Sequence, residues 1–255
     1  MGTAVFTAIR WMRWQLDRKP QARKRAKTGW AYSVFSHESP LYRKLAGSPE
    51  ELLANKIVNL GLACQSLDGL VLRPGESLSY WRQVGNPRAG RGFRPGLVLR
   101  QGRPAIGLGG GLCQLSNLLY WMTLHTPLRV TERWRHSYDV FPDSGRTLPF
   151  GSGATCVYNY RDLCIENPTA ASFQLLLAIG ATHLHGEWRS DFEPLQTYQV
   201  YEAAHWFSQA PNGAHVRNNL LRRQTLRAGS LEADELVAEN HALLMYPPFL
   251  EGPDH

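Results

Sequence analysis

Three consecutive glycines stand directly before Leu112 and Cys113 in the stretch GLGGGLCQLSNLLYW, residues 107–121. Glycine adopts backbone conformations that are closed to other residues, so this run predicts a sharp corner in the chain. The residues that follow place apolar side chains at 115, 118, 119 and 122, the spacing of one helix face. Pro127 then ends the helix. The sequence therefore predicts a helix of about Cys113 to His125 that starts at a Gly-Gly-Gly-Leu-Cys corner.

Strand patterns lie on both sides of this helix. FRPGLVLRQGRPAIGL predicts two strands joined by a turn at Gln101-Gly102, and Ser48 and Pro49 predict the start of an earlier helix. After the central helix, further strands are predicted in LRVTERWRH, ATCVYNY, LCIEN, SFQLLLAIG, THLHGEWRS and YQVYEAAHWF. The tail predicts a hairpin that turns near Gly229-Ser230, with a helix as the alternative for its second part, DELVAENHALLMY. We expect an α+β fold with a mostly antiparallel sheet and few helices.

The positive charge of the chain is concentrated at one end. Residues 1–27 hold eight basic residues and one acid, whereas the rest of the chain holds equal numbers of both. We expect a basic arm over 1–34, a core domain over 35–190 and a β-rich extension over 191–255 packed on that core. Such an arm is typically a solvated extension. In a second interpretation, residues 1–27 bind an anionic membrane surface. The stretch MGTAVFTAIRWMRWQL would then lie on it as an amphipathic helix, with apolar anchors at Val5, Phe6, Ile9, Trp11, Met12 and Trp14.

Several classes of site and location are disfavoured by the sequence. No stretch approaches the ~20 apolar residues that span a bilayer, and the N-terminus lacks the order of a signal peptide. We therefore expect a cytoplasmic protein, with the arm as a means of holding it at the inner membrane face. Four cysteines are too few for a disulfide framework, so reduced thiols are expected. His183, His185 and Glu187 alternate along a strand, but exposed strand polarity explains them as well as a metal does, and we expect no metal and no cofactor.

The longest distinctive segment resembles a known family. The run GGGLCQLSNLLYWMTLHTPLRVTERWRHSYDVFPDSGRTLPFGSGATCVYNYRDLCIENPT, with LACQSLDGLVLRPGESLSYW upstream and THLHGEWRSD and ENHALLMY downstream, is similar to the VanW family. The resemblance covers most of residues 35–250. Family members occur in B-type glycopeptide (vancomycin) resistance gene clusters as accessory proteins and as domains of cell-envelope proteins. It therefore implies a link to peptidoglycan or its precursors as partners, without implying a particular reaction.

Cys113 is the first candidate for chemistry. At a helix N-terminus, backbone N–H groups and the helix dipole stabilise a thiolate and lower the pKa of a cysteine. His136 could serve as the base, with Asp139, Asp143 or Glu132 as the group that orients it. The amides of Gly109, Gly110 and Gly111, together with Gln114, could hold an oxyanion. These residues predict a cysteine-dependent hydrolase or acyl transferase, and the resemblance implies peptidoglycan stem peptides or their precursors as its substrates.

A second hypothesis needs no reaction. The same loops would form a binding module for a wall precursor or a partner enzyme, with Cys113 buried and Ser137, Tyr138 and Arg146 lining the site. Arg146 would hold the carboxylate of a D-alanyl terminus or a phosphate through two hydrogen bonds. Nucleic-acid binding through the arm is the weakest alternative, and we expect none, since the remainder of the chain is near neutral.

Overall fold

The computed structural model describes residues 2–42, 49–100, 102–140 and 147–246. The helices within these ranges are α1 (Thr3–Leu16), α2 (Glu50–Leu67), α3 (Tyr80–Val84), α4 (Cys113–Leu124) and the short 3-10 turn η1 (Ala89–Arg91). The strands are β1 (Tyr32–Pro40), β2 (Val71–Leu72), β3 (Ser77–Ser79), β4 (Pro95–Arg100), β5 (Arg103–Leu108), β6 (Arg129–Glu132), β7 (Tyr138–Asp139), β8 (Cys164–Glu166), β9 (Phe173–Ile179), β10 (His183–Ser190), β11 (Gln196–Gln209), β12 (His215–Arg227) and β13 (Ser230–Leu244). The predicted α+β class with mostly antiparallel strands is confirmed.

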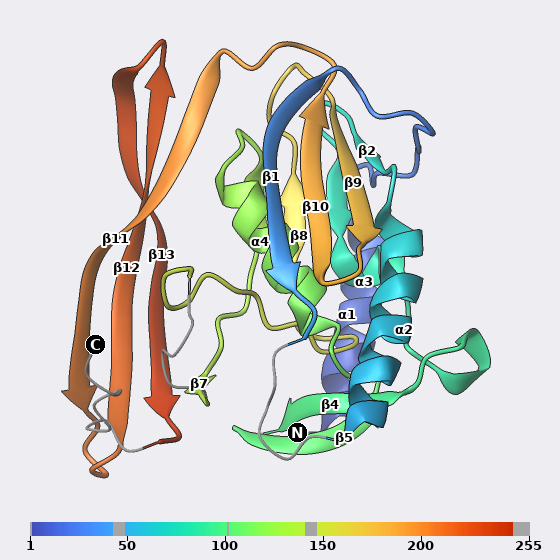
Figure 1. The fold of residues 1–255 in the computed structure, drawn as a ribbon, viewed down its shortest axis with the longest axis vertical. Coiled ribbons are helices and arrows are strands. Elements are labelled where there is room, and N and C mark those ends of the chain that lie inside the picture. The colour runs from blue at the N-terminus through green and yellow to red at the C-terminus, as the bar shows by residue number, and fades with distance from the viewer. Residues whose placement is uncertain (1, 43–48, 101, 141–146, 247–255) are drawn as a thin grey trace.

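The main layer is an antiparallel sheet in the order β1-β10-β9-β2, with α2 and α4 packed on one face of it (Figure 1). Helix α4 crosses β10 closely, because a Cβ added at Gly186 would lie 2.7 Å from the sulfur of Met122. Helix α2 packs against β9, and its buried face includes Leu60 and Leu67. Burial of these apolar faces between sheet and helices forms the core.

A second sheet is built from the long strands β11, β12 and β13, with β7 added along the edge of β13 (Figure 1). Leu243 of β13 pairs with Tyr138 of β7 in parallel, so the C-terminal strands are hydrogen-bonded to the middle of the chain. The predicted tail hairpin is confirmed, and its turn passes through Ala228 and Gly229, both at positive φ. Two smaller sheets, β3-β8-β6 and β4-β5, complete the fold.

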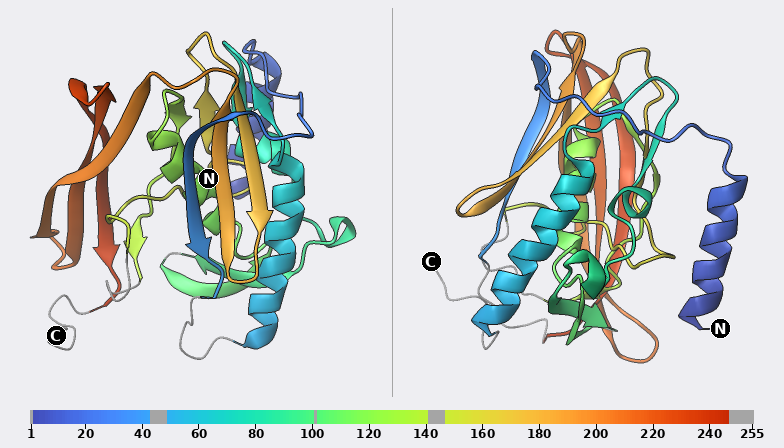
Figure 2. Two further views of the ribbon diagram at one scale, coloured as in Figure 1. Left: turned by 45° about the horizontal axis from the view of Figure 1, so that its top comes forward. Right: turned by 90° about the vertical axis from the view of Figure 1, so that its right-hand side faces the viewer.

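Most of the described residues of the N-terminal arm are exposed, but the arm is held to the folded protein at several points. Ala22 is completely buried, Gln21 bridges to Ser77, and Arg25 bridges to Leu70. Figure 2 shows α1 along one side of the molecule, joined to the sheets by the segment that contains these bridges. Backbone pairing at residues 21 and 25 explains how so basic a segment stays ordered.

Two strand predictions need correction. LRVTERWRH forms a strand only over β6, so His136 lies in the loop after it. ATCVYNY forms a turn instead of a strand, with one isolated bridge between Val157 and Arg161. The reason is that this segment runs along α4, where the Ser116 hydroxyl donates to the Ala154 carbonyl at 2.8 Å.

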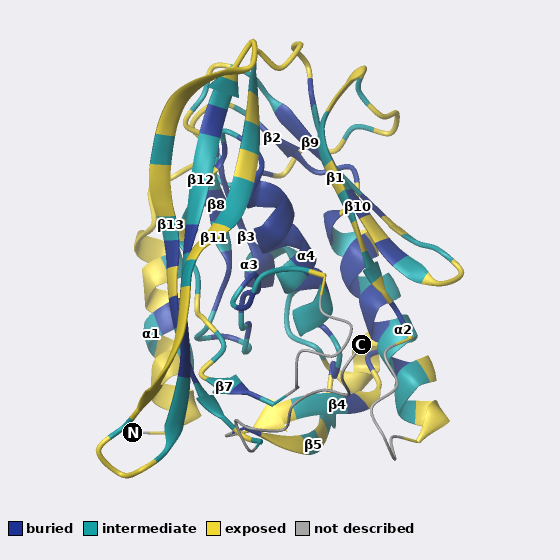
Figure 3. Cartoon of the chain, turned by 60° about the vertical axis from the view of Figure 1, so that its left-hand side comes forward, coloured by how far each residue is buried: buried dark blue, intermediate teal, exposed yellow. Residues whose placement is uncertain are grey.

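The predicted helix start at residues 48 and 49 is seen only in part. Pro49 caps α2 and the helix begins at Glu50, while Ser48 lies outside the described residues. Across the part of the chain that the structure describes, every helix is too short or too polar to cross a membrane. Figure 3 shows the buried positions gathered in α4 and in the strands next to it. The Gly-Gly-Gly-Leu-Cys corner leads directly into α4, which is buried at most positions from Leu115 onward.

Candidate functional site

The glycine corner is a point where two stretches of backbone touch. A Cβ added at Gly110 would lie 2.0 Å from the carbonyl carbon of Gly96, a distance that no side chain can occupy. Asn59 of α2 holds both stretches, because its amide nitrogen donates to the carbonyl oxygens of Gly110 at 2.9 Å and Arg94 at 3.0 Å. The glycines at the start of α4 are therefore required by packing.

The backbone N–H groups of the corner already have partners. Gly109 donates to the Arg94 carbonyl at 3.1 Å, Gly110 to Gly107 at 3.2 Å, and Gly111 to Leu97 at 3.1 Å. A donor bonded within the protein stabilises an oxyanion only if that bond is first broken, which costs free energy. The geometry thus gives no support to the predicted oxyanion role of Gly109, Gly110 and Gly111.

Cys113 opens α4 as predicted, but its expected low pKa is wrong. Its thiol lies 3.8 Å from the carbonyl oxygen of Cys156, to which it donates a weak hydrogen bond. Burial raises the pKa of Cys113 above its usual value, and this effect outweighs the backbone contact to Cys156. Because the thiolate is the nucleophile, a raised pKa reduces the reactive fraction near neutral pH.

His136, in the loop after β6, contacts α4 one helical turn beyond Cys113, and both of its ring nitrogens are hydrogen-bonded. Its Nε2 is 3.2 Å from Oδ1 of Asn117, and its Nδ1 is 2.8 Å from Oγ1 of Thr155. The Asn117 oxygen also accepts a hydrogen bond from the backbone N–H of Ala154 at 2.9 Å. Because an amide oxygen can only accept, Nε2 donates to Asn117, whereas the Thr155 hydroxyl can either donate to Nδ1 or accept from it. The structure places Cys113 and His136 on one side of α4 and gives each of them different partners.

The other predicted site residues are dispersed. The Gln114 side chain donates to Oγ of Ser39 and to the Pro40 carbonyl, both at 2.9 Å, which ties α4 to the end of β1. Asp139 is almost fully buried and accepts hydrogen bonds from Arg217 at 3.2 Å and the Tyr246 hydroxyl at 3.0 Å. Both residues thus join separate elements of the fold.

Tyr138 and Ser137 lie beside the C-terminal strands. The ring of Tyr138 sits over Gly102, where a Cβ would be 2.8 Å from it, and the Ser137 carbonyl accepts from Leu243 N–H at 3.0 Å. The Ser137 residue is exposed. Arg146 and Asp143 fall outside the described residues, so the predicted carboxylate clamp stays a prediction.

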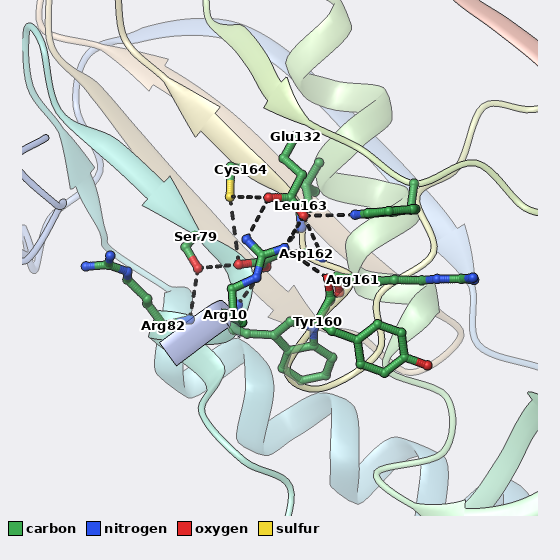
Figure 4. A network of polar contacts seen from close by, with 11 residues as sticks. Arg10, Ser79, Arg82, Glu132, Tyr160, Arg161, Asp162, Leu163 and Cys164 are labelled. Carbon is green, nitrogen blue, oxygen red and sulfur yellow. Dashed lines mark hydrogen bonds and ion pairs between the residues drawn. The ribbon is translucent and has the colours of Figure 1, made fainter. Parts of the chain in front are cut away.

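A second polar cluster was missed from the sequence (Figure 4). It joins Arg10 of α1, Glu132 of β6, Ser79 of β3, Asp162 and Cys164. Arg10 binds the Glu132 carboxylate through two hydrogen bonds and also donates to the Tyr160 carbonyl at 3.0 Å. Asp162 accepts from the Ser79 hydroxyl at 2.5 Å and from Trp81 N–H at 3.0 Å. Of these five, only Glu132 was a candidate on sequence grounds, since nothing local marks the rest.

The electrostatics of this cluster separate its two carboxyl groups. Burial raises the pKa of Asp162 to about 6, against the hydrogen bonds from Ser79 and Trp81. The pKa of Glu132 is lowered, since its hydrogen bonds from Arg10 and Trp134 together outweigh its burial. Burial beside both carboxylates raises the pKa of the Cys164 thiol. In this cluster the Cys164 thiol stays protonated and Arg10 balances the charge of Glu132. Such an arrangement suits attachment of α1 better than nucleophilic catalysis.

Beside this cluster, Trp134 and Arg161 present an aromatic and cationic surface. The Arg161 guanidinium lies 5.4 Å from the Trp134 ring centre, within the range of a cation–π contact. Trp134 is 44% exposed, and its indole N–H donates to Glu132 at 2.8 Å. Arg135 follows as an exposed residue. We call Trp134, Arg135 and Arg161 the Trp134 surface.

The alternating histidines of β10 make ordinary surface contacts. His185 lies 3.2 Å from a carboxylate oxygen of Glu38, and His183 lies 2.8 Å from the Thr182 hydroxyl. Glu187 pairs with Arg189 at 3.5 Å. Over the described ranges, histidine, cysteine and acidic side chains form no group of three that could hold a metal ion.

All four cysteines have free thiols, as the sequence predicts. Cys64, Cys113, Cys156 and Cys164 are unpaired by disulfides. Cys156 and Cys164 lie on either side of the turn that the Val157–Arg161 bridge closes, and Cys156 is buried. Their role is therefore in packing and in the polar contacts described above.

A family model and a known protein both match this chain and indicate the same family. The family model described as VanW like protein matches residues 55–189. The vancomycin B-type resistance protein VanW of Enterococcus faecalis is 30% identical over 217 residues, which cover 85% of this chain and 79% of that protein. The uncharacterized protein YoaR of Bacillus subtilis is 27% identical over 109 residues, 43% of this chain and 34% of that protein. No solved structure matches the chain.

The matched region covers the glycine corner, the central helix and the Trp134 surface. Residues 55–189 extend from α2 through the glycine corner, α4 and the Trp134 surface to the end of β10. The similarity to the Enterococcus protein extends beyond this region to most of both chains. The chain therefore belongs to the VanW family.

Proposed function

We propose that this chain is an accessory protein related to vancomycin resistance that binds a peptidoglycan precursor without turning it over. The link to resistance is supported by its similarity to the Enterococcus protein over 85% of the chain. The choice of binding over catalysis depends on the environment of Cys113. Its thiol donates a hydrogen bond to the Cys156 carbonyl, and burial raises the pKa of that thiol.

The Trp134 surface is the part of the described chain that we propose for precursor binding. Stem peptides end in a carboxylate, which a guanidinium binds with charge-assisted hydrogen bonds. The half-exposed indole of Trp134 offers apolar area next to the Arg161 guanidinium and the exposed Arg135. Arg10 compensates the negative charge of Glu132 behind this surface, so the carboxylate there does not oppose an anionic ligand.

The experiment compares two kinds of variant in a host whose VanW-type protein has been removed from its resistance cluster. We expect Cys113→Ala to restore vancomycin resistance as well as the original chain does. We expect Trp134→Ala combined with Arg161→Ala to restore much less. Trp206→Ala provides a matched control, because Trp206 is similarly exposed at 40% but lies on β11.

Calorimetry with a peptide ending in D-alanyl-D-alanine tests binding directly. The Trp134 and Arg161 variant should bind it about tenfold more weakly than the original chain, and the Trp206 variant should bind it equally well. Loss of resistance in a correctly folded Cys113→Ala chain would contradict the proposal and support a thiol enzyme. Equal peptide binding by all variants would remove the Trp134 surface as the binding site.

A further inference from the structure

The orientation of α1 is the reverse of what a helix on a soluble protein normally shows. Its one buried residue is Arg10, while Val5, Trp11, Met12 and Leu16 are between 45% and 79% exposed. A surface helix ordinarily turns its apolar stripe to the core and its charged residues to water. Here these four apolar side chains are exposed, although Trp14 packs against the core, and the right-hand view of Figure 2 shows α1 at the edge of the molecule.

The contacts of Arg10 fix this orientation. Its guanidinium binds Glu132 and the Tyr160 carbonyl, so the helix cannot rotate without breaking a largely buried ion pair. Trp14, one turn later, lies against Arg82, whose guanidinium is 5.3 Å from its ring centre. Residues spaced by four thus hold one face of α1 to the protein, and the opposite face must point away from it.

From this geometry we infer that α1 docks the chain on an anionic membrane surface with its outward face in the lipid interface. This inference is independent of the proposed precursor site. Apolar side chains of an interfacial helix enter the boundary between headgroups and acyl chains, and nearby cations bind the negatively charged lipids. Val5, Trp11, Met12 and Leu16 supply the apolar area.

The charge of the neighbouring segment matches this partner. Residues 1–27 carry eight basic side chains and one acidic one, although the rest of the chain is neutral overall. Arg13 of α1 is exposed, as are Arg18, Arg23, Lys24 and Lys27 in the segment that follows. A second copy of this chain would bring the same positive charge to the contact, and the two copies would repel each other. An anionic lipid surface provides the opposite charge.

Co-sedimentation of the full chain with vesicles tests the inference. One vesicle contains phosphatidylcholine alone, and the other contains phosphatidylglycerol and phosphatidylcholine in equal parts. We expect binding to the anionic vesicle to be about tenfold or more tighter than to the neutral one, and to weaken as salt is added. Met12→Glu with Leu16→Glu should reduce binding to the anionic vesicle about tenfold or more, because both side chains would enter the interface.

A matched control replaces equally exposed apolar residues elsewhere. Phe192 and Leu195 lie between β10 and β11 and are 65% and 72% exposed, so Phe192→Glu with Leu195→Glu should bind as the original chain does. Thermal unfolding of both double variants checks that each one is folded. The inference is overturned if neither vesicle binds the chain, or if both double variants lose binding equally. It is also overturned if the chain dimerises without lipid and Met12→Glu with Leu16→Glu disperses the dimer.

Discussion

The guanidinium of Arg10 and the carboxylate of Glu132 form a two-bond ion pair between residues 122 positions apart in the chain, with Nη1 2.7 Å from Oε2. Arg10 is only 7% exposed, and its other contact is the Tyr160 carbonyl. This pair joins the first helix to β6, the strand that follows the central helix. The attachment of α1 therefore combines this polar contact with the packing of Trp14 against the core.

Replacing Arg10 by alanine should lower the free energy of unfolding by about 2 kcal/mol, because Glu132 would remain partly buried without its counter-charge. Urea unfolding at neutral pH measures the change. Arg13→Ala is the control, since Arg13 lies on the same helix but is exposed, and it should change stability by no more than about 0.5 kcal/mol. Equal losses in the two variants would show that the ion pair adds nothing beyond helix propensity.

Asp162 should make stability depend on pH in the direction opposite to an ordinary carboxylate. Its pKa in the folded chain is about 6, above the usual value of 3.8, so the folded state binds the proton more tightly than the unfolded state does. The stabilisation by protonated Asp162 is present below about pH 4 and is lost as pH rises through about 6. Because the pKa of Glu132 moves the other way, the measurement is a comparison with Asp162→Asn. The stability of the original chain relative to that variant should fall by about 2 kcal/mol between pH 4 and 7.

Cys113 should react slowly with iodoacetamide at neutral pH. Its raised pKa leaves little thiolate, and its sulfur faces the Cys156 carbonyl. We expect alkylation in the native chain to be about tenfold or more slower than at the same residue in urea, as followed by mass spectrometry of the peptide that contains it. Native labelling of Cys113 faster than in the unfolded chain would show an activated thiol and restore the enzymatic hypothesis.

Gly110→Ala should destabilise the fold by about 3 kcal/mol or more, because the added Cβ would overlap the Gly96 backbone and neither stretch can move aside easily. Thermal or urea unfolding measures the loss. The control is Gly90→Ala, where an added Cβ meets no atom within 4 Å. That variant should stay within about 0.5 kcal/mol of the original chain. Similar stability of the two variants would mean that the backbones at Gly96 and Gly110 can separate.

The sequence predicts the parts of this fold that local pattern controls. Helix α4, the β4-β5 hairpin and the β12-β13 hairpin lie where periodicity and turn residues place them. The segment 154–160 defeats the same reasoning, because its alternation is that of a strand while its backbone is bonded to Ser116 and Asn117 of α4. Contacts with a distant helix override local propensity there.

The candidate site shows the same limit more strongly. A cysteine near the end of a glycine run at a helix start predicts an activated thiol. The helix start is confirmed, but burial of the thiol raises the pKa of Cys113 instead of lowering it. Arg10 could not be assigned to Glu132, because nothing local to either residue identifies a partner 122 positions away. Burial and long-range pairing decide the electrostatics of both groups, and neither is visible in a short motif.

The contact between Gly96 and Gly110 also bears on how relatives of this chain can diverge. Wherever the two stretches of backbone approach this closely, position 110 must remain without a side chain, whatever residue occupies position 113. Retention of the glycine run in a relative would then report that its backbone crosses in the same way, and would say nothing about whether that relative performs a reaction.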